Sequence, residues 1–180
     1  LILCNSVDFI QVGDARIYPD SSRVRIRKAA AMDTLKNAMI VANYITKYHT
    51  FKEAQIKISS RKYYEGTAKY PYYDRDSNLT VLPMNSIKFV NSTTTAEGEV
   101  KEKDRFKLSK EFDYYGNVIV RASNQGLFLK GSTRLNHDCK YDKSWMTFED
   151  TVLATNIQIP IQAEPKNAKG ERLAVGFLWR

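Results

Sequence analysis

The chain has 180 residues, of which 43% are hydrophobic and 27% are charged. This length suits one domain, or one domain and the start of a second, and the composition supports a buried core, which argues against an intrinsically disordered segment. No apolar run approaches the ~20 residues of a membrane-spanning helix, and the formal net charge of +8 favours an acidic partner, such as nucleic acid, anionic lipid or an acidic protein surface.

The first predicted elements are a strand over 7–18 and a long amphipathic helix over 22–47. Ser21 and Ser22 can cap the helix, because a serine hydroxyl accepts a hydrogen bond from the first turn. An apolar stripe recurs at spacings of three, four and seven residues, which is the period of one helix face. The stripe consists of Val24, Ala31, Leu35, Ala38, Ala42 and Ile45. We therefore expect a continuous helix with Leu35 buried.

The middle of the chain is rich in tyrosine. Residues 55–64 alternate in part and predict either a strand or a short helix, and residues 66–78 contain Pro71 and predict an exposed loop. Residues 79–90 predict an edge strand or two separate pieces, because Pro83 interrupts the pattern. Exposed tyrosines are enriched at protein interfaces. The sequence therefore predicts that residues 63–90 contact a neighbouring protein, with tyrosines packed over a sheet edge as the alternative. The predicted interface residues are Tyr63, Tyr64, Tyr70, Tyr72 and Tyr73.

The second half of the chain reads as β-structure. Residues 105–122 predict a hairpin with its turn at 113–117, and 151–161 alternate apolar and polar residues as a half-buried strand does. Residues 173–179 form a continuous apolar run that suits a buried strand. These elements predict an α+β fold, with one long amphipathic helix packed on an antiparallel, β-rich body. We expect a domain over 1–135 and an extension or second α/β domain over 136–180, with a single domain over 1–180 as the alternative.

Signatures of catalysis are weak. The chain contains neither G-x-G-x-x-G nor G-x-x-x-x-G-K-[ST], the glycine-rich motifs that cradle phosphates. Its two histidines are His49 and His137, and the adjacent run His137-Asp138-Cys139 cannot easily converge on one metal ion. We therefore expect a protein with no catalytic residues, no metal and no cofactor.

The two cysteines, Cys4 and Cys139, are too few for a disulfide framework. They can pair in an oxidising compartment and join the N-terminus to a late loop, or they can remain free thiols. The sequence leaves both alternatives open.

Several residues resemble the N-terminal region of the FlgT family of flagellar H-ring proteins, which are periplasmic components of the basal body. That family opens with a strand and a helix of the type A-R-x-x-A-x-x-D-A-x-x-x-A-[LM], and this chain keeps Arg27, Ala30, Asp33, Ala38 and Met39. The triplet 98–100 (Gly-Glu-Val) precedes the 106–122 hairpin in the family's order, followed by Cys139, Tyr141 and Lys143. The resemblance implies a structural ring subunit present in many copies.

Three functions follow as hypotheses. The first is a non-catalytic assembly subunit of a bacterial cell-envelope machine, such as a flagellar basal-body ring or a secretion system. It would be periplasmic or associated with the outer membrane, contact other envelope proteins and form an oligomer. The second is a basic nucleic-acid-binding module that uses the tyrosine-rich loop and a basic cluster on the helix, Arg23, Arg25, Arg27 and Lys28. The third is a small enzyme whose site leaves no signature in the sequence.

Overall fold

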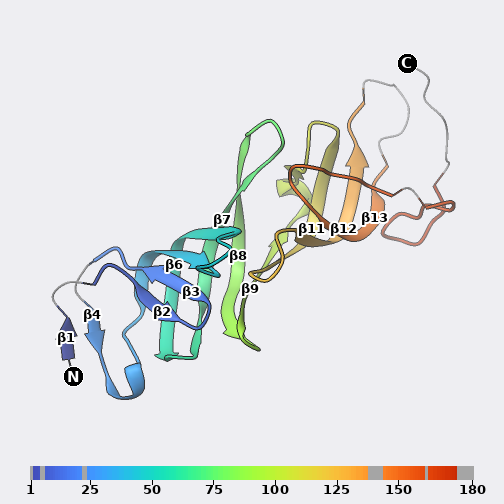
Figure 1. The fold of residues 1–180 in the computed structure, drawn as a ribbon. Helices are drawn as coiled ribbons and strands as arrows, with labels where there is room; N and C mark the ends of the chain where they lie inside the picture. Colours follow the sequence, from blue (N-terminus) through green and yellow to red (C-terminus); the bar gives the residue numbers. More distant parts are fainter. Residues whose placement is uncertain (1, 5–6, 22–23, 138–143, 161, 174–180) are drawn as a thin grey trace.

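The computed structural model describes residues 2–4, 7–21, 24–137, 144–160 and 162–173, and it is almost entirely antiparallel β-sheet (Figure 1). Strands account for 60% of the residues and helical turns for 3%, and no described helix reaches seven residues. The prediction of an α+β fold with a long helix is therefore wrong. No helix within the described residues has the length and apolarity to cross a membrane.

The predicted helix over 22–47 is replaced by β4 (Val24–Ile26), a short 3-10 turn η1 (Lys28–Ala30) and β5 (Leu35–Ala42). Within β5, buried Ala38, Ile40 and Ala42 alternate with exposed or half-buried neighbours, which is the period of a strand. Two alanines four residues apart satisfy a helical period and a strand period equally well. Pairing with β3 (Ala15–Tyr18) and β6 (His49–Ser60) on the two sides of β5 decides the outcome. Leu35, which was expected to be buried, is only half-buried.

Ten strands of the main sheet follow one another as a meander, with the order β13-β12-β11-β9-β8-β7-β6-β5-β3-β2. Two further pairs lie off this path, because β1 (Ile2–Cys4) pairs with β4 and β10 (Phe106–Lys107) pairs with β11, and a short 3-10 turn η2 (Glu102–Asp104) precedes β10. The remaining strands are β2 (Ile10–Val12), β3 (Ala15–Tyr18), β6 (His49–Ser60), β7 (Tyr63–Tyr73), β8 (Leu79–Val90), β9 (Thr93–Val100), β11 (Phe112–Arg121), β12 (Leu127–Leu135) and β13 (Met146–Val152).

The strand predictions have mixed outcomes. The strand predicted over 79–90 exists as β8, but the prediction of an edge strand is wrong, because β8 pairs with β7 on one side and with β9 on the other. The exposed loop predicted over 66–78 is wrong, because β7 continues to Tyr73. The hairpin in 105–122 exists as β10 paired with β11, but its turn lies at 108–111 rather than at 113–117. The strand predicted over 151–161 ends at Val152, and the apolar run 174–179 lies outside the described residues.

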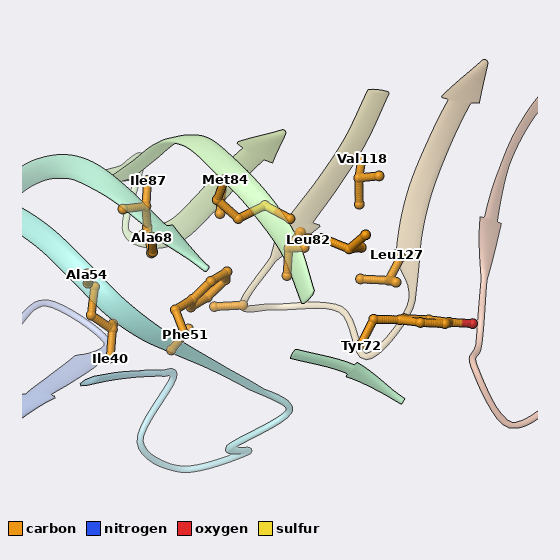
Figure 2. Packing of buried hydrophobic residues seen from close by; sticks show 14 of the residues in the cluster. Ile40, Phe51, Ala54, Ala68, Tyr72, Leu82, Met84, Ile87, Val118 and Leu127 are labelled. Carbon is orange, nitrogen blue, oxygen red and sulfur yellow. The ribbon is translucent and has the colours of Figure 1, made fainter. Parts of the chain in front are cut away.

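The buried core follows the inner face of the sheet across both halves of the molecule. Figure 2 shows Ile40, Phe51 and Ile87 in the N-terminal half, and Val118 and Leu127 in the C-terminal half. Between these two groups lie further buried side chains, among them Leu82 and Met84 of β8. The sheet also continues beyond position 135, the end of the first domain expected from the sequence, because β13 pairs with β12 over seven residues.

The N-terminal half is curled so that the β2–β3 turn meets the β8–β9 turn. Asp14 accepts hydrogen bonds from the backbone N–H of Thr94 at 3.0 Å and from its hydroxyl at 2.6 Å. Next to it, Gly13 has φ of +58°, and a Cβ at this position would lie 2.1 Å from Cζ of Phe89. A glycine is therefore favoured here for two reasons, the backbone conformation and the close approach of the aromatic ring.

Candidate docking site on the β7–β8 ribbon

Strands β7 and β8 extend beyond the strands that flank them. The pairing of β6 with β7 ends at Lys52↔Lys69, and the pairing of β8 with β9 begins only at Ser86↔Glu97. Residues 70–73 and 79–82 therefore pair with each other alone, and we call residues 70–82 the ribbon. In Figure 1 the ribbon projects as a hairpin between the two halves of the sheet.

The tip of the ribbon is held by Asp74. Its carboxylate accepts hydrogen bonds from the backbone N–H groups of Asp76 at 2.9 Å and Asn78 at 2.8 Å. The side-chain amide of Asn78 donates a third bond at 2.9 Å, and this bond is the main cause that holds the pKa of Asp74 below its usual value. An aspartate that bonds to backbone groups two and four residues ahead fixes the shape of the turn.

The inner face of the ribbon is anchored in the C-terminal core. Tyr72 is 2% exposed, and its hydroxyl donates a hydrogen bond to the carbonyl of Leu108 at 2.6 Å. Its ring meets the ring of Phe106 edge-on, with centroids 5.4 Å apart, and burial raises the pKa of Tyr72. Leu82 is buried on the same face. The base of the ribbon is therefore a packed and hydrogen-bonded element rather than a free loop.

The outer face of the ribbon exposes apolar side chains. Tyr73 is 51% exposed, Leu79 54% and Val81 50%. Tyr73 lies opposite Leu79 in the register, and Pro71 lies opposite Val81. Directly opposed residues project from the same face of a sheet. Pro71, Tyr73, Leu79 and Val81 therefore form one continuous surface, which we call the apolar strip.

A proline marks one open edge of the ribbon. Pro71 lies in β7 beyond the point where β6 has left, whereas Pro83 of β8 lies outside the ribbon, opposite Lys69 and close to Gly98 of β9. Proline has no N–H to donate, so a strand accepts it only where its nitrogen faces away from the ladder. The nitrogen of Pro71 therefore faces the open edge of β7, and proline at an open edge opposes the addition of another strand.

A cleft of about 290 Å³ opens where β6 leaves β7. Its lining residues come from the ribbon, from the start of β6 and from the segments around β12 and after β13, and none of them is charged. They include Tyr48, Tyr70, Tyr72, Tyr73, Gln125 and Leu127, and we call this cavity the tyrosine cleft. Its position places an uncharged, aromatic cavity beside the apolar strip.

A buried histidine fixes the position of Tyr70 in this cleft. His49 is 1% exposed, and its Nε2 lies 2.7 Å from the carbonyl oxygen of Asn124, which can only accept a hydrogen bond. Burial lowers the pKa of His49, so the neutral imidazole carries its proton on Nε2. Nδ1 therefore accepts from the hydroxyl of Tyr70 at 3.0 Å. Burial also raises the pKa of Tyr70 to about 12, which keeps this hydroxyl protonated.

The five predicted interface tyrosines do not form one exposed surface. Tyr64 is fully buried and hydrogen-bonded to the Thr94 hydroxyl, Tyr72 is buried in the ribbon, and Tyr70 is half-buried in the cleft. Tyr63 is 38% exposed at the start of β7 and donates to Glu65 at 2.8 Å. Tyr73 alone lies on the apolar strip, so the interface prediction now concerns Tyr73 and the cleft.

Sequence reasoning missed Tyr48 and Gln125, whereas Leu79 and Val81 lie within the segment 63–90 that was predicted to contact a partner. Leu79 and Val81 alternate, which is a signal of one shared face, but alternation alone does not say whether that face is buried.

Within the predicted basic cluster, Arg27 forms an ion pair with Asp33, and Arg25 lies in β4 opposite Leu3. The predicted pair of Cys4 and Cys139 has one member, Cys139, outside the described residues.

Among the described residues, no group of three or more histidine, cysteine or acidic side chains could hold a metal ion. Residues 26–39, which carry the resemblance to the FlgT family, are strand and 3-10 turn rather than helix over the described segment. Comparison of the chain with family models, curated proteins and solved structures gives no match.

Proposed function

We propose that this protein is a non-catalytic assembly module that docks another protein through the apolar strip. The observation that carries the proposal is the joint exposure of Tyr73, Leu79 and Val81, each about half exposed on one face of a projecting hairpin. Single exposed apolar residues are ordinary on a protein surface, whereas contiguous ones mark interaction sites. Tyrosine adds a large contact area with few rotatable bonds.

The construction of the ribbon supports the same function. Binding costs less entropy when the binding surface is ordered in advance. Here the Asp74 turn fixes the tip, and the Tyr72 hydroxyl fixes the base on Leu108. Pro71 protects the open edge of β7, which directs recognition to side chains on the outer face rather than to strand addition.

The wider setting of this module also belongs to the proposal. An assembly subunit of a bacterial cell-envelope machine, either a flagellar basal-body ring or a secretion system, would use such a surface between its copies or against a neighbouring protein. It would be periplasmic or associated with the outer membrane.

The test compares one double variant of the full chain with a single-residue control variant. Leu79→Ser with Val81→Ser removes the centre of the apolar strip, and we expect the chain to leave its native complex and sediment as a monomer. The control is Ile45→Ser, because Ile45 is 75% exposed but lies outside the ribbon. Sedimentation velocity on native extracts measures the mass of the complex. Unchanged mass in the double variant, or an equal loss in the control, would contradict the proposal.

The same preparation tests the nucleic-acid alternative. Binding through lysine and arginine contacts to phosphates weakens steeply as salt rises, because bound counterions are released. A complex that persists at high salt and contains no nuclease-sensitive component agrees with protein docking. A complex that nuclease dissolves would favour nucleic-acid binding instead.

A further inference from the structure

The tyrosine cleft differs from the other cavities in its charge. Other cavities described in this chain carry charged residues, such as Arg25 and Asp33 in one and Lys110 and Glu111 in another. The tyrosine cleft has none, although 27% of the chain is charged. A ligand for this cleft is therefore itself uncharged over the part that enters, which disfavours phosphates, carboxylates and acidic peptides.

The backbone of the cleft disfavours an ordinary β-strand as its occupant. Residues 70–73 present their open edge at the cleft, and Pro71 has no N–H to offer at the middle of that edge. A partner strand would leave at least one of its carbonyls without a ladder bond. An extended segment that needs no ladder is a polyproline II helix, whose backbone makes no internal or lateral ladder bonds.

We propose that the tyrosine cleft binds a proline-rich segment of the docked partner in the polyproline II conformation. The inference rests on the proposed docking function and names the chemistry of the segment that this part of the site takes. Aromatic-lined grooves receive such segments, because flat rings contact the pyrrolidine rings and the ligand is ordered before it binds. Tyr48 and Tyr73 supply two half-exposed rings in the cleft.

The polar groups of the cleft match this ligand. Proline residues offer carbonyl oxygens as acceptors and no N–H donors, so the complementary site is rich in donors. Tyr48, Tyr73 and Gln125 line the cleft, and their side chains make no hydrogen bond within the described part of the chain. Two phenolic hydroxyls and one amide can therefore donate to the carbonyls of a proline-rich segment. The Tyr70 hydroxyl is already committed to His49.

The experiment measures binding of a fluorescently labelled decaproline peptide to the full chain by fluorescence anisotropy. We expect Tyr48→Ala and Tyr73→Ala each to weaken binding about tenfold or more, as the loss of a central aromatic anchor does. Tyr63→Ala is the matched control, because Tyr63 lies on the same strand and is 38% exposed but does not line the cleft. We expect the Tyr63→Ala variant to bind decaproline with unchanged affinity. We also expect the native chain to bind equally well at low and high salt, because no charge takes part. Thermal unfolding confirms that each variant is folded.

No binding of decaproline, an equal loss in the Tyr63→Ala control, or equal binding of a glycine-serine peptide would each overturn the inference. Preferential binding of a neutral oligosaccharide would also overturn it, since a sugar uses the same rings and donors. The docking proposal is unaffected by these results if the double variant Leu79→Ser with Val81→Ser still dissociates from the native complex. Tight, Tyr48-dependent peptide binding supports the inference even if that double variant leaves the complex intact.

Discussion

Asp14 and Thr94 connect the two turns that close the curl of the N-terminal half, although they lie 80 residues apart. The Thr94 hydroxyl donates to the Asp14 carboxylate, which can only accept, and it therefore accepts from the hydroxyl of Tyr64 at 2.8 Å. Thr94 is 1% exposed. Removing the carboxylate would leave both Thr94 donors without this acceptor, so the contact is a sensitive test of the curl.

The magnitude follows from the two bonds. A hydrogen bond to a charged group contributes about 1.5–3 kcal/mol, and a buried donor left without a partner costs about 1–3 kcal/mol. Because Asp14 is half-buried, water replaces part of the loss, and we expect Asp14→Ala to lower the free energy of unfolding by about 2–4 kcal/mol. Thr94→Val removes the hydroxyl bond but keeps the backbone bond, so we expect a smaller loss of about 1–3 kcal/mol.

The assay is urea unfolding of the two single variants and the double variant. If the residues interact as described, the double variant loses less than the sum of the single losses, by about 1–2 kcal/mol. Asp8→Ala is the control, because Asp8 is an exposed acid of the same region, and we expect a change within about 0.5 kcal/mol. Additive losses of Asp14→Ala and Thr94→Val would refute the closing contact.

Three further predictions concern single positions. His49 has a lowered pKa in the folded protein because burial disfavours the charged ring, so the unfolded chain binds the proton more readily below the usual histidine pKa of 6.5. Stability is therefore full above pH 6.5 and falls as the pH drops below it, and His49→Gln should flatten this slope of at most about 1.4 kcal/mol per pH unit in urea titrations. Gly13→Ala should lower the midpoint of thermal unfolding, because a Cβ would strain a left-handed residue and collide with Phe89, whereas Gly170→Ala, which meets no atom within 4 Å, separates the cost of strain from the cost of collision. Tyr72→Phe should cost about 0.5–1.5 kcal/mol in urea unfolding, because the buried bond to Leu108 is lost, and an unchanged value would argue against the anchoring of the ribbon.

Strands could be predicted from the sequence where the spacing of apolar residues fitted the period of a strand and not that of a helix. Leu79–Val90 and the paired strands after Arg105 followed from β-type alternation, although the turn was misplaced. The prediction failed over residues 22–47, because Ala38 and Ala42 satisfy the periods of both a helix and a strand. The deciding interactions are the ladders to β3 and β6, which come from residues elsewhere in the chain.

The site was harder to predict for a related reason. Both faces of the ribbon carry apolar residues, with Tyr72 and Leu82 inside and Tyr73 and Val81 outside. Local sequence cannot say which face the C-terminal core covers. Pro71 suggested a loop because proline interrupts most strands, whereas an open edge accepts it. The tyrosine-rich segment was therefore correctly singled out as unusual, but its division into buried and exposed members required the register of the sheet.

Site-specific photocrosslinking from the ribbon tests the docking claim most directly. A photoreactive amino acid at position 79, which is 54% exposed on the apolar strip, is compared with one at position 45, which is 75% exposed elsewhere. The account predicts a discrete protein adduct from position 79 and none from position 45 in the native complex. An adduct from position 45 alone, or identical products from both positions, would contradict docking through the ribbon.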